Sequence, residues 1–418
     1  MSKLIIDGSR RLSGEIKIQG SKNSVLPILA ASVIVGGESI IHNCPKISDV
    51  KFTIDILKHL GCKVRLQNNT IIVDSSNIVK NDIPNTLMRE MRSSIIFLGA
   101  LVSACGSARL SLPGGCDLGP RPIDLHLDGL RQMGLRINET HGIIECDSVG
   151  KLQGCNIALS FPSVGATENL ILAAVKAQGT TMLTNIAKEP EIIDMINFLV
   201  KCGANIKCLQ NGAIIINGVK KLHGAEHTVM ADRIVAVTYM AAAASTAGEL
   251  VECGVTDEYL GSVIPVFEEA GCIIEKPDKD KLKILAPSRL CFNRLIRTMP
   301  YPGFPTDAQA PVMAMTTIAD GTSMFVENIF SSRYKHVGEL LRLGADIKVE
   351  GKVAIVEGVK KIFGAEVNAT DLRGAAALVV AGLAAEGVTK MSGMSYLNRG
   401  YENLVNNLNN IGASVKVV

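Results

Sequence analysis

The chain has 418 residues, of which 47% are apolar and 20% charged, and its formal net charge is +3. This composition is typical of a folded globular protein with two or three domains, and so small a net charge does not indicate nucleic acid or a membrane surface as a partner. No apolar run reaches the roughly 18 residues that a membrane-spanning helix needs, and the first residues lack the layout of a secretory signal peptide. We therefore expect a cytoplasmic protein, and its eleven scattered cysteines indicate reduced thiols rather than disulfides.

A short sequence motif at the end of an amphipathic run occurs six times along the chain. It begins as LGCKV at residues 60–64 and returns as MGLRI, CGANI, AGCII, LGADI and IGASV, with its glycine at positions 61, 134, 203, 271, 344 and 412. The spacing of about 70 residues predicts six copies of one structural unit.

Each copy contains the same predicted elements in the same order. A run that is apolar on all sides predicts a buried helix, and it is followed by a short β-rich run, a variable loop, an amphipathic helix such as residues 49–61, and a hairpin such as residues 62–74. The unit is therefore βαβαββ, and the fold class is α/β with helices inside and sheets outside. The six buried runs are residues 25–37, 95–106, 169–179, 234–248, 310–321 and 375–387.

Six units of this length are too many for one hydrophobic core, so we expect two domains of three units each. The N-terminal strand segment lies before the first repeat helix and can pair with the C-terminal units. The expected domains are then residues 1–20 with 230–418, and residues 21–229, with crossings near residues 19–22 and 228–232.

Polar or charged residues stand at the start of each buried helix. The cations among them are Lys22, Arg92, Arg233 and Arg373. Because the N-terminus of a helix presents unpaired backbone N–H groups and a positive dipole, these positions predict binding of phosphate or carboxylate groups. The alternative is that the polar residues are plain helix caps.

The variable loop of the second unit is longer than the others. From Gly106 to Gly134 it spans 28 residues, against 23 to 25 in the other units. The additional residues belong to the stretch LPGGCDLGPRP at 112–122, whose glycines and prolines favour a loop, and a lid is the expected role. Such a lid would bring Cys116 and Arg121 onto a bound anion, where nearby positive charge favours the thiolate.

The sequence gives little indication of a metal, a cofactor or a nucleic acid. His223 and His227 have the i, i+4 spacing of metal ligands, but Phe363 and Val367 stand at the matching positions two repeats later and the segment is not helical. No phosphate-binding P-loop, dinucleotide-binding GxGxxG or GxSxG motif is present, and with no tryptophan the chain offers few stacking platforms for single-stranded nucleic acid. We expect no metal and no cofactor.

Several longer motifs resemble those of the enolpyruvyl transferases, in particular the bacterial family that acts on UDP-N-acetylglucosamine. The motifs are GSKNSVLPILAA, LPGGCDLGPRPIDLHL, SVGATEN, EPEIID, FPTDAQAP and NRGYENL, and the resemblance covers the chain from the first strand to the last repeat. It implies a two-domain inside-out α/β barrel. It also implies transfer of the enolpyruvyl group of phosphoenolpyruvate to the 3-hydroxyl of UDP-N-acetylglucosamine by addition and elimination, with release of phosphate, as the first committed step of peptidoglycan precursor synthesis and hence of cell-wall growth and division.

The resemblance also implies the roles of individual residues. Cys116 matches the lid cysteine that donates a proton or aids product release and that the inhibitor fosfomycin alkylates, Asp307 matches the candidate base, and Lys22 and Arg399 complete the catalytic set. The residues expected to bind phosphoenolpyruvate are Lys22, Asn23, Arg121 and Arg399. Those expected to bind the UDP-sugar are Asn23, Arg92, Arg121, Pro122, Ile123, Asp124, Leu125, Phe161, Pro162, Ser163, Val164, Gly165, Asp307 and Ile329. Glu189, Asp232, Arg233, Arg333 and Arg373 match further active-site positions.

One position departs from the family pattern. Some members have lysine near the diphosphate where this chain has Phe161. The diphosphate would then depend on Arg92, on backbone N–H groups and on another lysine.

Two alternatives remain open at this point. One is 5-enolpyruvylshikimate-3-phosphate synthase, which shares the fold and phosphoenolpyruvate but needs neither the lid thiol nor a uridine pocket. The other is a non-enzymatic repeat ring such as a DNA clamp, which would carry basic residues along the helices that line its channel. The buried runs of this chain are nearly free of charge, which argues against a clamp.

Overall fold

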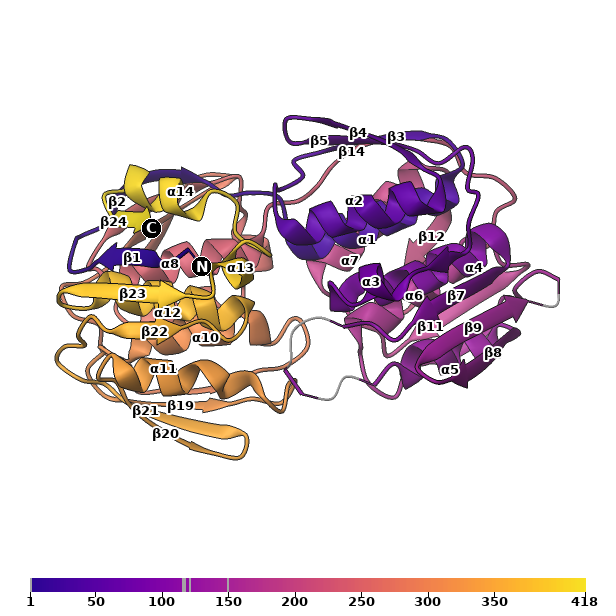
Figure 1. Cartoon of the computed structure of the whole chain (residues 1–418). Coiled ribbons are helices and arrows are strands. Elements are labelled where there is room, and N and C mark those ends of the chain that lie inside the picture. Colours follow the sequence, from indigo (N-terminus) through magenta and orange to yellow (C-terminus); the bar gives the residue numbers. More distant parts are fainter. Residues whose placement is uncertain (1, 115–117, 120–121, 149) are drawn as a thin grey trace. The chain divides into compact units, whose positions relative to one another are not determined.

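A computed structural model describes residues 2–114, 118–119, 122–148 and 150–418 (Figure 1). In this part of the chain the strands form six four-stranded sheets, one for each predicted repeat. The second repeat shows the common order, β6 (Asp82–Ile83), β7 (Ser107–Ser111), β9 (Ile143–Ser148) and β8 (Leu135–Thr140). Its first two strands are parallel and its other neighbours antiparallel, as a strand–helix–strand crossover followed by a hairpin requires. The predicted βαβαββ unit is confirmed.

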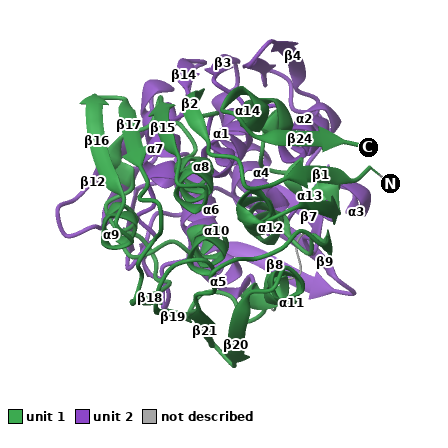
Figure 2. Cartoon of the chain, turned by 90° about the vertical axis from the view of Figure 1, so that its left-hand side faces the viewer, with its two compact units in different colours: residues 1–19, 117–120, 231–418 green, residues 20–116, 121–230 purple. Residues whose placement is uncertain are grey.

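The chain folds into two compact units, which Figure 2 colours separately. Among the described residues, unit 1 contains 2–19, 118–119 and 231–418, and unit 2 contains 20–114, 122–148 and 150–230. Each unit has its own hydrophobic core.

Unit 2 holds the first three repeats. Its inner helices are α1 (Lys22–Val35), α4 (Phe97–Cys105), which continues the 3₁₀ turn η1 (Arg92–Ile96), and α6 (Val164–Ala174). Its other helices are α2 (Ser48–Leu60), α3 (Asn85–Met88), α5 (Asp124–Gln132) and α7 (Pro190–Lys201). Besides β6 to β9, its strands are β3 (Glu38–His42), β4 (Lys63–Gln67), β5 (Thr70–Asp74), β10 (Asn156–Ala158), β11 (Thr180–Thr184), β12 (Asn205–Cys208), β13 (Ile214–Asn217) and β14 (Glu226–Thr228).

Unit 1 holds the last three repeats and the N-terminal strands. Its inner helices are α8 (Arg233–Ser245), α10 (Thr306–Thr316) and α12 (Leu372–Ala384). Its other helices are η2 (Asp257–Tyr259), α9 (Ile264–Glu269), η3 (Arg333–His336), α11 (Val337–Arg342), α13 (Met394–Leu397) and α14 (Leu404–Asn410). Its strands are β1 (Leu4–Asp7), β2 (Ser13–Lys17), β15 (Glu249–Cys253), β16 (Ile273–Asp278), β17 (Lys281–Leu285), β18 (Leu295–Arg297), β19 (Thr322–Val326), β20 (Asp346–Glu350), β21 (Val353–Glu357), β22 (Glu366–Asn368), β23 (Val388–Ser392) and β24 (Ser414–Val417).

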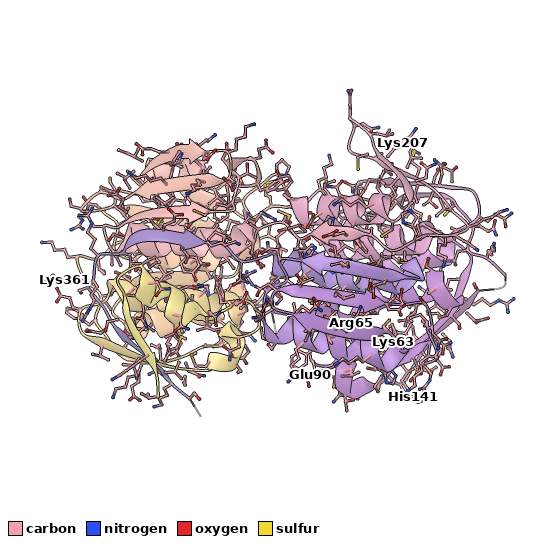
Figure 3. The ribbon with its side chains drawn as sticks, turned by 90° about the horizontal axis from the view of Figure 1, so that it is seen from above. Lys63, Arg65, Glu90, His141, Lys207 and Lys361 are labelled. Atoms are coloured by element: carbon pink, nitrogen blue, oxygen red, sulfur yellow. The ribbon has the colours of Figure 1, made fainter. Side chains whose placement is uncertain are left out.

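The inner helices form the centre of each unit and the sheets form its outside. Every residue of α8 is buried, and Figure 2 shows α8, α10 and α12 together in the middle of unit 1 with its sheets around them. On the outside, Lys63 and Arg65 lie two residues apart on β4 and are exposed to solvent (Figure 3). Side chains two apart on a strand share a face, so the outer face of this sheet is solvated while its inner face covers the helices.

Two sheets take their edge strand from a part of the chain that is distant in sequence. β2 precedes α1 in the chain but pairs in parallel with β15, and β14 precedes α8 but pairs in parallel with β3. The N-terminal segment also closes the last repeat, because β1 lies between β23 and β24, as expected from the sequence. The second strand of that repeat's hairpin therefore comes from the start of the chain.

The six repeat glycines end the helices as predicted. Gly61, Gly134, Gly203, Gly271, Gly344 and Gly412 all have φ between 90° and 106°. This left-handed conformation is accessible to glycine without the strain that a Cβ adds.

The central position of β1 leads to a stability prediction. Ile6 on β1 is fully buried, whereas its neighbour Ile5 points to the other face and is only partly buried. We expect Ile6→Ala to lower the free energy of unfolding of unit 1 by about 2–5 kcal/mol, and Ile5→Ala, the matched control, by less than about 1.5 kcal/mol. Urea denaturation of both variants is the measurement, and equal midpoints would contradict the assigned register of β1.

Candidate active site

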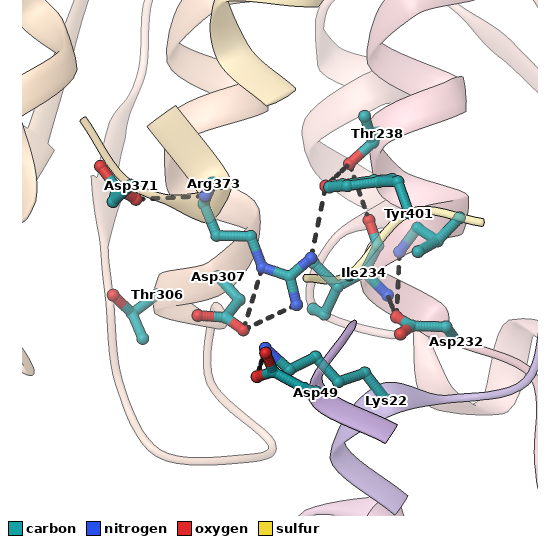
Figure 4. Close-up of polar contacts among 12 residues, drawn as sticks. Lys22, Asp49, Asp232, Ile234, Thr238, Thr306, Asp307, Asp371, Arg373 and Tyr401 are labelled. Carbon is teal, nitrogen blue, oxygen red and sulfur yellow. Dashed lines mark hydrogen bonds and ion pairs between the residues drawn. The ribbon is translucent and has the colours of Figure 1, made fainter. Parts of the chain in front are cut away.

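The carboxylate of Asp307 lies between two buried arginines in unit 1. Asp307 is in the first turn of α10, and its Oδ1 accepts a hydrogen bond of 2.9 Å from Nη2 of Arg333. Its Oδ2 accepts from Nη2 and Nε of Arg373, on α12, at 2.9 and 3.2 Å (Figure 4). Both arginine side chains are only 2% exposed, and that of Asp307 is 27% exposed. The carboxylate is thus fixed from both sides but still open to a reactant.

Further contacts tie the Arg373 side chain to α8. Nη1 of Arg373 donates to the hydroxyl of Tyr401 at 3.3 Å, and that hydroxyl lies 2.9 Å from Oγ1 of Thr238 on α8. Burial opposes the charge of Arg373, but Asp307, Tyr401 and Asp232 outweigh it and raise the pKa of the guanidinium above its usual value. Arg373 is therefore a permanent cation that joins α8, α10 and α12 at one end of unit 1.

Carboxylates of the protein itself occupy two of the helix N-termini that we expected to bind anions. Oδ1 of Asp232 accepts from the N–H groups of Ile234 and Val235 at 3.0 Å each, at the start of α8. Asp371 caps α12 in the same way through the N–H groups of residues 373 and 374, and Ser163 caps α6 through the N–H of residue 166 at 3.4 Å. The side-chain caps that the alternative expects are present at these three helices. No side-chain cap is present at α1 or α10 in the described part of the chain.

The remaining unit 1 residues of the expected site are Arg233, the first residue of α8, and two loop residues, Ile329 and Arg399. The guanidinium of Arg233 lies over the ring of Tyr301, 5.6 Å from its centre. Arg399 is partly exposed and lies two residues after the end of α13. The backbone N–H of Ile329 donates to Oε1 of the buried Glu327 at 2.8 Å, and Oε2 of the same carboxylate accepts from Thr306, the first residue of α10. Glu327 thus fixes the loop of Ile329 relative to α10.

Lys22 is paired with a buried carboxylate in unit 2. Its Nζ lies 2.9 Å from Oδ2 of Asp49, which is in the first turn of α2 (Figure 4). The Lys22 side chain is 12% exposed and that of Asp49 only 1%. Asn23, the next residue, is exposed. The ion pair therefore fixes the ammonium group beside a residue that solvent or a ligand can reach.

Unit 2 also contains a buried histidine, His126, which is close enough to Arg92 for its pKa to be affected by the arginine charge. Nδ1 of the His126 ring lies 2.7 Å from Nδ2 of Asn169, and because an amide nitrogen can only donate, the imidazole accepts there and carries its proton on Nε2. Asn169 also holds the backbone of η1 through Ile95 and that of α4 through Gly99. Burial and the charge of Arg92 lower the pKa of His126 to about 4.

The two segments expected to line the UDP-sugar site are on the surface of unit 2. Of residues 122–125, which lead into α5, Pro122 and Asp124 are exposed, Leu125 partly so and Ile123 buried. In residues 161–165, which lead into α6, Phe161 is 45% exposed and the other four are partly buried. The sequence-based assignment of these residues to a substrate remains a prediction.

Three carboxyl groups meet at the base of α6 and α7. Burial, followed by the charges of Glu189 and Glu191, raises the pKa of the fully buried Glu168 well above its usual value. Glu189 precedes α7 and is partly exposed, and Glu191 is in its first turn. The surroundings of Glu168 therefore favour its neutral form.

The structure brings some of the predicted site residues together and adds neighbours that the sequence did not predict. Asp232, Asp307, Arg333 and Arg373 meet in unit 1 as one network. The sequence did not predict four neighbours of the site: Asp49, His126, Asp371 and Tyr401. The sequence features that could have indicated them are an acidic residue in a first helical turn and polar residues inside the quoted motifs. Cys116 and Arg121 lie outside the described residues. His223 and His227 do not form a pair, because His223 is exposed while His227 is buried against Asp194.

Comparison with known proteins identifies the family. Residues 6–408 match the family model described as EPSP synthase (3-phosphoshikimate 1-carboxyvinyltransferase). The crystal structure of the enolpyruvyl transferase NikO from Streptomyces tendae superposes with a TM-score of 0.91 at 26% identity, covering 100% of this chain and 99% of that one. EPSP synthase from Acinetobacter baumannii, at 19% identity and a TM-score of 0.78, shares the fold. The chain belongs to the enolpyruvyl transferase family.

Within this family the chain is similar to enzymes of one name. It is 50% identical over 99% of both chains to UDP-N-acetylglucosamine 1-carboxyvinyltransferase 2 of Caldanaerobacter subterraneus subsp. tengcongensis. It is 46% identical to UDP-N-acetylglucosamine 1-carboxyvinyltransferase 1 of Carboxydothermus hydrogenoformans, over 100% of this chain and 99% of the relative.

The lowered pKa of His126 predicts a specific pH dependence. Because the group binds a proton near pH 6.5 when unfolded but only at about 4 when folded, its contribution to stability is complete above pH 6.5 and is lost as the pH falls toward 4. The loss over this window is about 3 kcal/mol. The measurements are the NMR titration of the His126 ring and urea denaturation at pH 7.5 and 5, with His126→Gln expected to lose less stability on acidification. A ring midpoint near 6.5 would contradict the buried, neutral histidine.

Proposed function

We propose that this protein transfers the enolpyruvyl group of phosphoenolpyruvate to the 3-hydroxyl of UDP-N-acetylglucosamine and releases phosphate. The observation that carries the proposal is the 43 to 50% identity, over 99 to 100% of this chain, to enzymes named UDP-N-acetylglucosamine 1-carboxyvinyltransferase. The chemistry of the two site regions supports it, because each combines fixed cations with a partly exposed polar group. The protein would then act in the cytoplasm, in the first committed step of peptidoglycan precursor synthesis, and so serve cell-wall growth and division.

The reaction needs proton transfers at two atoms. In the addition, the sugar 3-oxygen loses its proton and bonds to C2 of phosphoenolpyruvate, while C3 gains a proton and becomes a methyl group. In the elimination, that methyl group loses a proton and the C2–O bond to phosphate breaks, which restores the double bond. A positioned carboxylate and a positioned acid can perform these steps.

Asp307 is the proposed base at the sugar hydroxyl. Two buried guanidinium groups orient its carboxylate, and its 27% exposure leaves it accessible to a hydroxyl group. Arg333 and Arg373 are then positioning residues. Charge-assisted hydrogen bonds of this kind are short and directional, so they fix the carboxylate where a proton must be removed.

The cations of the expected site suit an acceptor and a donor that are both anionic. Phosphoenolpyruvate carries up to three negative charges on few atoms, for which we propose Lys22, Asn23, Arg121 and Arg399. For the UDP-sugar we propose the residues given by the resemblance, with Arg92 near the diphosphate. Phe161 cannot donate a hydrogen bond from its side chain, so the diphosphate depends on other groups.

We propose that Cys116 supplies or relays a proton, and we expect no metal, cofactor or nucleic acid to take part.

The two acceptors of the family distinguish the proposal from its nearest alternative. We expect phosphate release from phosphoenolpyruvate when UDP-N-acetylglucosamine is present and none when shikimate-3-phosphate replaces it. A continuous phosphate assay with each acceptor, and mass spectrometry of the product, is the measurement. Release with shikimate-3-phosphate alone would establish the EPSP synthase alternative, and binding to circular DNA without release would favour a clamp.

Removing the negative charge of Asp307 tests its role as the base. Asp307→Asn keeps the size and one acceptor oxygen but cannot take up the proton, so we expect kcat to fall by at least ~10²-fold. Circular dichroism and the dissociation constant of the UDP-sugar serve as controls for folding and binding. A near-normal kcat would leave Asp307 as a group that only orients the sugar.

A further inference from the structure

A buried carboxylate in unit 2 joins three separate segments of the chain. Asp194 is on α7 and only 9% exposed. Its Oδ1 accepts from Nε2 of His227 on β14 at 2.9 Å, and its Oδ2 accepts from the backbone N–H of Met230 at 3.0 Å. Oδ2 also accepts a hydrogen bond from the hydroxyl of Ser24, in the first turn of α1.

These contacts close a ring around the start of α1. The backbone N–H of Ser21 donates to the carbonyl of Met230 at 2.7 Å, and the N–H of Ser24 donates to the carbonyl of Ser21 at 3.3 Å. The path from Asp194 through Met230, Ser21 and Ser24 returns to Asp194. Residues 21–24 are therefore held at both ends, and Lys22 and Asn23 lie between the two anchors.

The carboxylate suits this role chemically. A buried carboxylate is stable only when its lone pairs are satisfied, and here one hydroxyl, one imidazole and one backbone amide provide three donors. Ser24 is fully buried and His227 is 4% exposed, so water does not compete for these bonds. The ring of His227 also packs edge-on against Phe198 of the same helix as Asp194, with ring centres 5.8 Å apart, which fixes its orientation.

We infer that Asp194 is a positioning residue for Lys22 and Asn23, acting through Ser24 and Met230. The first turn of α1 sets the direction in which these two side chains project, and the ion pair of Lys22 with Asp49 needs that direction. Rotation of the turn by loss of the Ser24 anchor moves the ammonium group away from its partner. The inference rests on the proposed function, in which Lys22 and Asn23 bind phosphoenolpyruvate. It also accounts for the burial of His227 beside Asp194.

Three substitutions in the network, compared with one outside it, test the inference. Asp194→Asn removes the negative charge and one of the two acceptor oxygens. Ser24→Ala removes the hydroxyl donor, and His227→Gln replaces the imidazole with an amide whose nitrogen can still donate. The matched control is Asp147→Asn, the same chemical change at an exposed position of unit 2. We expect Asp194→Asn to raise KM for phosphoenolpyruvate and to lower kcat/KM by at least ~10-fold, Ser24→Ala to follow it in part, His227→Gln to stay near the wild type, and Asp147→Asn to have no effect.

A purely structural role predicts a different result. Loss of folded protein lowers the apparent kcat but leaves KM unchanged, so an unchanged KM for phosphoenolpyruvate in Asp194→Asn overturns the inference. If Asp194→Asn acts by weakening the hydrogen bond from Ser24, the double variant with Ser24→Ala should be no worse than Asp194→Asn; full additivity counts against the inference.

Wild-type activity in the same assay separates this inference from the proposed function. If the wild type releases no phosphate with UDP-N-acetylglucosamine, the proposed function fails. A crystal structure of Asp194→Asn then decides the inference independently: displacement of Lys22 from Asp49 supports it, and an unchanged Lys22–Asp49 pair overturns it.

Discussion

The site in unit 1 depends on one buried ionic contact, in which the carboxylate of Asp307 satisfies both Arg333 and Arg373. Removing a guanidinium group from water costs several kcal/mol, which only a well-aligned anion offsets. Two arginines that are 2% exposed therefore require a carboxylate between them in the absence of substrate. The same arrangement orients that carboxylate, so the group that makes the burial of the arginines possible is also the one proposed to take the proton.

The burial of the inner helices explains why polar groups are concentrated at the N-terminal ends of these helices. Helices that are buried on all sides cannot carry charge along their length, so charge is confined to their first turns. There the backbone N–H groups need partners, and Asp232 and Asp371 supply them for α8 and α12. The dipoles of α8 and α12 are thus already opposed by acidic groups of the protein, so at these two helices the proposed anionic substrates depend on cationic side chains rather than on the helix terminus alone.

Local features of the fold could be predicted from the sequence, whereas features formed by distant residues could not. The glycine that ends each outer helix and the hairpin after it are recognised from neighbouring residues, so the repeat was predicted correctly. The particular sheets that β2 and β14 join were not, because each strand has the same local pattern whichever sheet it joins. Asp49 and Asp194 were missed for a similar reason: each is an ordinary acidic residue on an amphipathic helix until the fold brings Lys22 or Ser24 to it.

The buried titratable groups make stability depend on pH in two opposite directions. His126 in unit 2 and His336 in unit 1 both have a pKa lowered to about 4, in each case mainly by burial, so they favour the unfolded chain as the pH falls below 6.5. Burial raises the pKa of Glu168 and Glu252 well above the usual value. Groups shifted in this direction stabilise the folded chain at low pH, and that contribution is lost as the pH rises above about 4.5. Asp49, Asp194 and Asp307 differ from these two glutamates in that each has a cation or several donors beside it. The acids that have such partners are Asp307, the proposed base, and Asp49 and Asp194, which hold Lys22 and the helical turn that carries it.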